Sequence, residues 1–213
     1  MEISYLGHSS FLIKTLQATI VTDPFNESIG IKPKEVTADI VTISHHHFDH
    51  DNLGIVKGDP VVIDGPGEYD LKGVEIYGVP SFHDKSKGSE RGGNTIFVVE
   101  SEEIRLCHLG DLGLVLSEGE IEKLGEIDIL FTPIGGKYTI DSDEAVKLIS
   151  LIEPNIVIPM HYKTEGINLD IDTIEDFVEE MGIKDKKPKD KLVVKKGGFN
   201  EEETEAVVLK VQN

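Results

Sequence analysis

Short apolar runs rich in Val, Ile and Leu dominate the first half of the chain, and turn residues separate them. Runs of this length and composition are typical of β-strands. We expect strands over residues 2–7, 9–15, 18–24, 38–44, 59–65, 73–80, 94–100 and 103–111. The segment ADIVTIS at 38–44 is almost continuously apolar, which predicts a strand buried on both faces.

Helical patterns dominate the second half of the chain. We expect helices over residues 117–127, 141–154 and 170–182, where apolar positions recur at helical spacing. The charged stretch 184–191 predicts a surface loop, and 192–199 with 205–211 predict a closing hairpin around Gly197 and Gly198. Strands and helices alternate, which predicts one α/β domain over residues 1–213 with helices outside a large β core.

The charge and hydropathy of the chain limit the kinds of partner that we expect it to bind. No apolar run approaches the roughly 18–20 residues that a membrane span needs, and the N-terminus has no signal-peptide pattern. We therefore expect a cytoplasmic protein without membrane contact. The formal net charge of −19 repels phosphate backbones, so nucleic acid is an unfavourable partner and a small molecule is the expected one. No pattern predicts an oligomeric state.

The single cysteine, Cys107, excludes an intrachain disulfide and a thiolate metal cage. It falls in the middle of a predicted strand, where a core thiol is the better interpretation. The sequence also has no G-x-S-x-G elbow, so a serine or cysteine nucleophile is not expected. Any metal must then be held by His, Asp or Glu, which suits zinc, manganese or iron.

The segment SHHHFDHDN at 44–52 holds four of the eight histidines of the chain within six positions. His45 and His47 are two apart, so both point to the same side of an extended chain. Asp49 and His50 follow a turn at Phe48, where the chain can bend back toward the same space. The pattern H-x-H-x-D-H thus offers two subsets of ligands, which can serve two metal ions a few ångströms apart.

Three more candidate ligands each follow an apolar strand: His83, Asp111 and His161. Ends of strands converge in layered α/β folds, and sites gather there. The sequence therefore gives seven candidate metal ligands, which are His45, His47, Asp49, His50, His83, Asp111 and His161. Two sets of three with one bridging carboxylate would use all seven.

The motif SHHHFDH resembles the signature of the metallo-β-lactamase superfamily of hydrolases. Other segments resemble its ascorbate-phosphate-lactonase-like branch, namely GHSSFLI (7–13), TDPF (22–25), FHD (82–84), RGGNTIFVVE (91–100), HLGDLG (108–113), TPIGGKYTID (132–141) and IPMHYKT (158–164). The resemblance implies a four-layer αββα sandwich with the site at one edge between the sheets. It also implies a first metal site of His45, His47 and His83, a second of Asp49, His50 and His161, and Asp111 as the bridge.

The function implied is that of a metal-dependent hydrolase. Hydroxide bound to two divalent ions, zinc first and manganese, iron or nickel as options, would attack a small ester, lactone or phosphoester, an anionic one included. Asp49 would be a catalytic ligand that also orients the hydroxide. The alternatives are a phosphodiesterase or nuclease of the same superfamily, and a non-catalytic metal-binding protein.

Three residues outside the ligand set are candidates for substrate binding. His8 lies in the resembling motif GHSS, Arg91 is one of only two arginines, and Tyr138 follows a Gly-Gly pair. Each has a structural alternative: hydrogen bonding for His8, loop ordering for Arg91 and packing for Tyr138. His46 and His108 are expected to be structural, and Asp51 to cap a helix. Specificity is expected to reside in the loops 84–93 and 135–141.

Overall fold

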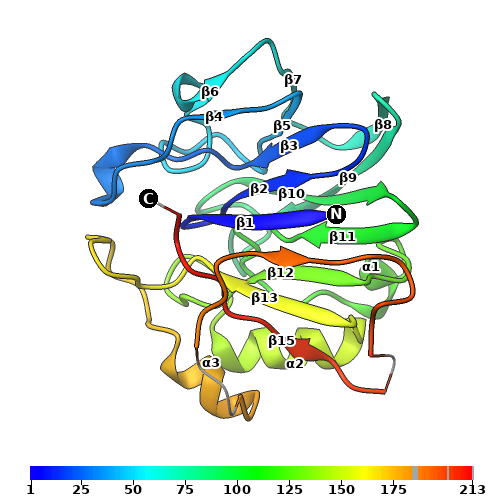
Figure 1. Ribbon diagram of the computed structural model, residues 1–213. Coiled ribbons are helices and arrows are strands. Elements are labelled where there is room, and N and C mark those ends of the chain that lie inside the picture. Colours follow the sequence, from blue (N-terminus) through cyan, green and yellow to red (C-terminus); the bar gives the residue numbers. More distant parts are fainter. Residues whose placement is uncertain (184–186, 201, 213) are drawn as a thin grey trace.

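Two β-sheets packed face to face form the centre of the computed structural model, which describes residues 1–183, 187–200 and 202–212 (Figure 1). The six-stranded sheet has the order β14 (Leu192–Val193), β1 (Glu2–Gly7), β2 (Ser10–Lys14), β3 (Thr19–Thr22), β5 (Ile40–Thr42) and β7 (Val61–Ile63). The seven-stranded sheet has the order β15 (Glu205–Ala206), β13 (Ile156–Met160), β12 (Ile129–Pro133), β11 (Ile104–His108), β10 (Gly93–Ser101), β9 (Val74–Phe82) and β8 (Gly67–Leu71).

The main core lies between the two sheets. Alternate residues of each strand point inward, as Ile3 and Tyr5 of β1 do, and both are buried. Phe11 of β2 stacks on Phe131 of β12 with ring centroids 4.0 Å apart, which joins one sheet to the other. This packing fixes the strand ends from which the candidate ligands project.

The outer face of the seven-stranded sheet is covered by helices: α1 (Glu118–Ile121), α2 (Ser142–Ile152) and α3 (Glu175–Glu180) (Figure 1). Asp141 and Glu144 form a capping box at the start of α2, which satisfies its first backbone N–H groups. None of the helices in the described part of the chain is long and apolar enough to cross a bilayer.

The outer face of the six-stranded sheet is covered differently. Its apolar layer combines Val21 and Val41 of the sheet with short 3-10 helices at Glu27–Ile29 and Leu53–Ile55, and with a two-stranded ribbon of β4 (Val36–Thr37) and β6 (Val56–Lys57). The molecule is therefore the expected α/β sandwich, with two sheets between two outer layers. In the described residues, however, this fourth layer is built from short 3-10 helices and a ribbon, without an α-helix.

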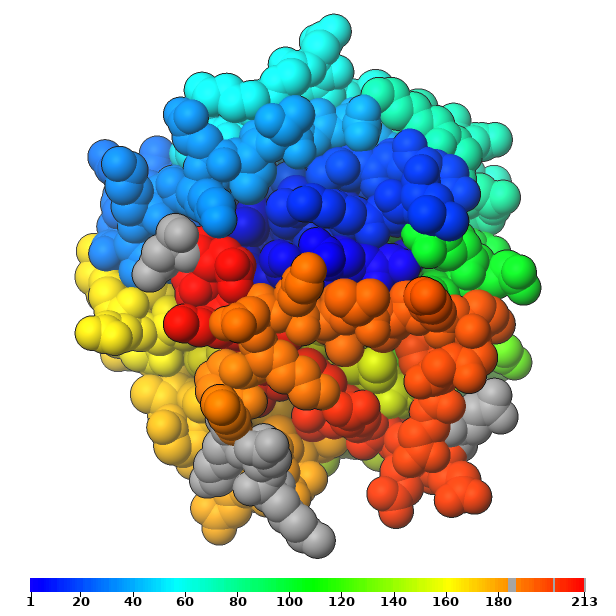
Figure 2. All heavy atoms as spheres, in the orientation of Figure 1, coloured from blue at the N-terminus to red at the C-terminus, as the bar shows by residue number. Residues whose placement is uncertain are grey.

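The closing hairpin predicted for 192–199 and 205–211 is wrong. Leu192 pairs antiparallel with Ile3 of β1, whereas Glu205 pairs parallel with Ile156 of β13, so the two segments belong to different sheets. Figure 2 shows the orange and red C-terminal segments lying across the join between the blue and yellow-green parts of the molecule. Each sheet has an edge strand that needs a partner, and this outweighs the local turn signal at the glycines.

Three local predictions also need correction. The helix predicted over 117–127 is only α1, four residues long. The helix predicted over 170–182 begins at Glu175, because Asp172 instead donates to Gly135 and accepts from Lys163 through its backbone. Asp51 does not cap a helix. That role falls to Asn52, whose side chain accepts a hydrogen bond from the backbone N–H of Gly54.

Candidate metal centre

The candidate ligands lie on segments that leave the carboxyl ends of strands. The segment after β5 carries His45, His47, Asp49 and His50 in a tight turn, in which the His50 backbone N–H donates to the His47 carbonyl oxygen at 2.9 Å. The other three follow single strands, with His83 directly after β9, Asp111 three residues after β11 and His161 directly after β13. The structure brings all seven together at one end of the sandwich.

Asp111 lies at the centre of this cluster. Its Oδ2 is 3.2 Å from Nε2 of His50 and 3.2 Å from Nε2 of His161. The same oxygen is 3.3 Å from Nε2 of His83 and 3.9 Å from Nε2 of His45. One carboxylate oxygen thus faces four imidazole nitrogens.

Three overlapping groups of side chains are close enough to share an ion, with ligand atoms within 4.8 Å of one another. The groups are His45, His47 and His83; His8, Asp49, His50 and His161; and His45, His50 and Asp111. The first two match the ligand sets expected from the resemblance, with His8 added to the second. The third joins the two sets through Asp111.

Unpaired buried atoms provide a test of whether a metal fits. Nε2 of His45 and His50, Nδ1 of His83 and His161, and Oδ1 of Asp111 are buried without a hydrogen-bond partner among the described residues. Leaving so many buried polar atoms unpaired is costly in a purely structural cluster. Imidazole nitrogens and carboxylate oxygens without thiolates are a donor set that divalent ions accept, so the residues present fit a metal.

Asp23 orients two of the candidate ligands. Its Oδ2 lies 3.0 Å from Nδ1 of His50 and accepts from the Ser44 hydroxyl at 2.6 Å. The Ser44 backbone N–H donates to the other oxygen of Asp23 at 2.7 Å, and the Ser44 hydroxyl lies 2.9 Å from Nδ1 of His45. A carboxylate behind a ligating histidine fixes the tautomer of its ring. Reasoning from the sequence missed this residue, although it lies in the segment TDPF.

His8 is buried against the cluster of candidate ligands. Its side chain is fully buried, and Nε2 lies 3.1 Å from Oδ2 of Asp49. Its carbonyl oxygen accepts hydrogen bonds from the His161 backbone N–H and the Tyr5 hydroxyl, at 2.8 Å and 2.7 Å. His8 therefore contacts the ligand cluster from inside the protein and belongs to the same group as Asp49, His50 and His161.

Burial and neighbouring charges together set the protonation states in the cluster. It lowers the pKa of His45 to about 3 and that of His8 to about 4, so both rings are neutral at pH 7 and have a lone pair for a metal. Burial would raise the pKa of Asp111, but the charges of His161 and His50 hold it well below its usual value. Burial would also lower the pKa of His50, yet Asp111 and Asp23 raise it, so metal binding there would release a proton.

Other residues singled out in the sequence lie outside the cluster. His46 is exposed between Asp51 and Asp64. Its Nδ1 lies 3.4 Å from the Asp51 carboxylate, and its Nε2 lies 3.4 Å from the Asp64 carboxylate. His108 is buried, and its Nε2 lies 2.8 Å from the Ser9 carbonyl oxygen. Cys107 is also fully buried, and this burial raises the pKa of its thiol.

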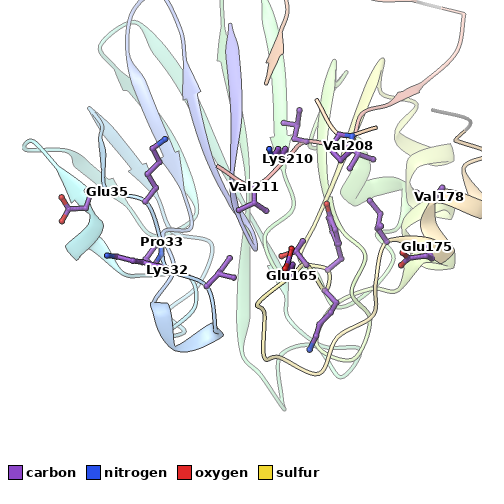
Figure 3. Close-up of a pocket in the computed structure, with 17 residues that line it drawn as sticks. Lys32, Pro33, Glu35, Glu165, Glu175, Val178, Val208, Lys210 and Val211 are labelled. Carbon is purple, nitrogen blue, oxygen red and sulfur yellow. The ribbon is translucent and has the colours of Figure 1, made fainter. Parts of the chain in front are cut away.

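A groove of about 1320 Å³ lies next to the cluster, but none of the seven candidate ligands lines it (Figure 3). Its walls come from residues 31–35, 162–165, the start of α3 and the C-terminal residues 208–211. Tyr162 and Lys163 belong to it and directly follow His161 in the chain. The groove therefore reaches the segment that follows His161, although no candidate ligand is among its lining residues.

This chain has two stacked sheets with a His/Asp cluster at one end. These features are typical of metallohydrolases with the metallo-β-lactamase fold. Residues 2–161 match the family model of the Beta-lactamase superfamily domain. The UPF0173 metal-dependent hydrolase of Methanopyrus kandleri is 31% identical over 86% of this chain and 94% of its own length. The chain belongs to this superfamily and, within it, to the UPF0173 metal-dependent hydrolases.

Two further relatives agree. A UPF0173 metal-dependent hydrolase of Carboxydothermus hydrogenoformans is 30% identical over 86% of this chain and 94% of its own length. A crystal structure from Thermotoga maritima, described as a proposed Zn-dependent hydrolase of the metallo-β-lactamase superfamily, has a TM-score of 0.80 and 39% identity over 99% of both chains. The protein is therefore a metal-dependent hydrolase.

Proposed function

We propose that this hydrolase holds two divalent ions, zinc in the first place, with manganese, iron or nickel as alternatives. His45, His47 and His83 would hold one ion, Asp49, His50 and His161 the other, and Asp111 would bridge them. The observation that carries the proposal is the position of Asp111 Oδ2, which faces Nε2 of four histidines at 3.2 to 3.9 Å. A site for one ion would need fewer ligands around that oxygen.

The chemistry of the site follows from its residues. Two bound divalent ions lower the pKa of a shared water toward neutrality and polarise the oxygen of a substrate. Burial would raise the pKa of Asp49, but the hydrogen bond from His8 and the nearby His50 hold it below its usual range. Asp49 is therefore ionised at neutral pH, and we assign it the catalytic role of orienting the attacking water in addition to ligation.

The substrate that this arrangement fits is a small ester, lactone or phosphoester. Each has an electrophilic carbonyl or phosphorus and a leaving oxygen, which a pair of cations a few ångströms apart can stabilise together. The net charge of −19 opposes the approach of a long polyanion. These properties support a small-molecule substrate.

The experiment begins with elemental analysis of the purified protein after incubation with zinc, manganese or iron. We expect about two ions per chain, and hydrolysis of at least one member of a panel of esters, lactones and phosphoesters. The variant Asp111→Asn keeps the size of the side chain but removes its charge. We expect it to lose at least one ion per chain and more than about 100-fold in turnover, since even residues behind the ligands contribute about 10–100-fold.

Asp51→Asn is the matched control, because Asp51 is close to the cluster in sequence but belongs to none of the three ligand groups. It should bind metal and turn over substrate like the wild type. Unchanged metal content and turnover in Asp111→Asn would refute the dinuclear site. Two tightly bound ions with no activity on the whole panel would instead favour a metal-binding protein without hydrolytic function.

A further inference from the structure

Two loops that flank the metal centre meet through a cation and an aromatic ring. The guanidinium carbon of Arg91, in the loop 84–93, lies 4.9 Å from the ring centroid of Tyr138, in the loop 135–141. This is within the range of a cation–π contact. Tyr138 is 37% exposed, so the pair lies at the surface where a ligand can reach it.

Both loops contact residues that are candidate ligands. The His83 backbone N–H donates to the Gly92 carbonyl oxygen at 3.1 Å, which places Arg91 next to the residue bonded to His83. Gly135 packs so closely on His161 that a Cβ there would lie 2.1 Å from the His161 carbonyl oxygen. The contact between Arg91 and Tyr138 therefore joins the loop that follows His83 to a loop that packs against His161.

The loop that carries Arg91 is held in one shape by a buried carboxylate. Asp84 accepts hydrogen bonds from the backbone N–H groups of Ser86, Gly88, Glu90 and Arg91, at 2.8, 2.9, 3.1 and 2.8 Å. Four such bonds fix the backbone at Arg91 before any ligand arrives. A preorganised loop backbone reduces the loss of conformational entropy that accompanies ligand binding.

The charge of Arg91 is not neutralised within the described residues. Lys85 and Lys137, on the same two loops, form ion pairs with Glu144 and Asp170. No carboxylate of the described chain pairs with the Arg91 guanidinium, which rests one face on Tyr138 and leaves its edge donors for a partner. A planar guanidinium with free edge donors suits bidentate binding of an oxyanion.

We propose that Arg91, positioned by Tyr138, binds an anionic group of the substrate, so that this enzyme acts on small molecules with a carboxylate or phosphate near the cleaved bond. The inference rests on the proposed hydrolase function and adds the substrate class. The negative net charge repels anions in general, and one guanidinium without an ion pair, on a loop bonded to His83, provides a local exception for a small anion. Tyr138 is a positioning residue in this scheme.

Calorimetry on the metal-loaded protein tests the binding part without turnover. The probes are phenylphosphonate and phenylacetate, which separate phosphate-like from carboxylate-like recognition, and Arg91→Met is the variant. We expect Arg91→Met to weaken binding of at least one probe about tenfold or more, as the loss of a charged bidentate contact does. Lys85→Met is the matched control, because Lys85 is a paired cation of the same loop, and it should stay within about twofold of the wild type.

The positioning role of Tyr138 needs its own pair of variants. Tyr138→Phe keeps the ring under the guanidinium and should bind the probes within about twofold of the wild type. Tyr138→Leu removes the ring and should weaken binding by about two- to fivefold, the size of an exposed cation–π contact. Equal binding by Tyr138→Leu and the wild type would overturn the role of Tyr138.

Kinetics with two matched ester substrates complete the test. One substrate carries a free carboxylate, and in the other this carboxylate is methylated. Arg91→Met should raise KM for the charged ester about tenfold and leave kcat and the neutral ester unchanged. The proposal would be overturned if Arg91→Met lost turnover of the charged and the neutral ester alike. It would also be overturned if Arg91→Met bound both probes as tightly as Lys85→Met does. If the wild type turns over no ester but Arg91→Met still binds a probe more weakly than the wild type, the hydrolase proposal fails and the anion site stands.

Discussion

Asp23→Asn is the sharpest test of how the fold prepares the ligands. Asp23 is fully buried, and its Oδ2 lies 3.0 Å from Nδ1 of His50. A proton on this nitrogen leaves Nε2 of His50 with a lone pair, and Nε2 is the atom 3.2 Å from Asp111. Asn has the same shape and tolerates the left-handed backbone of this position, where φ is 37°. The substitution therefore changes hydrogen bonding and charge with little effect on packing.

The magnitude follows from the geometry. The amide oxygen can keep the hydrogen bond from the Ser44 backbone N–H, which is 2.7 Å long in the wild type. The amide nitrogen then replaces the oxygen that faces His50 and donates to Nδ1, which moves the ring proton to Nε2 and blocks the lone pair. Loss of a partner behind a ligand costs about 10–100-fold in metal affinity. We expect the upper end of that range, about 2.7 kcal/mol.

The assay is a titration of metal against a chromophoric chelator, with circular dichroism to confirm the fold. Asp39→Asn is the control. Asp39 is a carboxylate that directly precedes β5, at the end of that strand opposite to the ligand segment, and it accepts hydrogen bonds from Thr19 and Lys72. It should bind metal as the wild type does. A folded Asp23→Asn protein with wild-type metal affinity would refute the tautomer argument.

Two further predictions concern the core. Cys107 is the only thiol of the chain, and burial makes it inaccessible and raises its pKa. Ellman's reagent should therefore leave it unmodified in the native protein and label one thiol per chain in denaturant. Rapid labelling of the native protein would contradict this burial. Phe131→Ala should lower the free energy of unfolding in urea by about 3–5 kcal/mol, because it removes the ring stacked on Phe11 between the sheets. Leu16→Ala, at an 86% exposed position, should change it by less than about 0.5 kcal/mol, and equal effects would contradict the assigned core.

Much of the candidate site could be predicted because its signal is local. The spacing of His45, His47, Asp49 and His50 is contained in six residues, and the turn that folds the pattern back is formed by the same segment. His83 and His161 could be added because each directly follows an apolar strand, whose end places it at one edge of a sheet. Their grouping around Asp111 needed the resemblance, since a single sequence does not say which strand ends meet.

The parts that could not be predicted depend on contacts between distant segments. Asp23 looks like an ordinary turn residue before proline, and only the packing of β3 beside β5 brings it to His50. The C-terminal strands β14 and β15 are two residues each, too short for a period of two to be recognised, and distant edge strands determine their pairing. The start of α3 is shifted by backbone hydrogen bonds of Asp172 to other loops, which no propensity encodes.

Three of the non-glycine residues with a positive φ lie in or directly behind the ligand cluster. His8, Asp23 and His161 all have positive φ values, of 56°, 37° and 52°, in a region where glycine is the least strained residue. Each such residue costs of the order of 1–3 kcal/mol unless its surroundings compensate. All three lie in or directly behind the ligand cluster, and the His161 backbone N–H donates to the His8 carbonyl oxygen at 2.8 Å. Glycine would relieve the backbone at each position but would remove a side chain that faces or supports the metal centre, so the sequence retains strain where the chemistry requires the side chain.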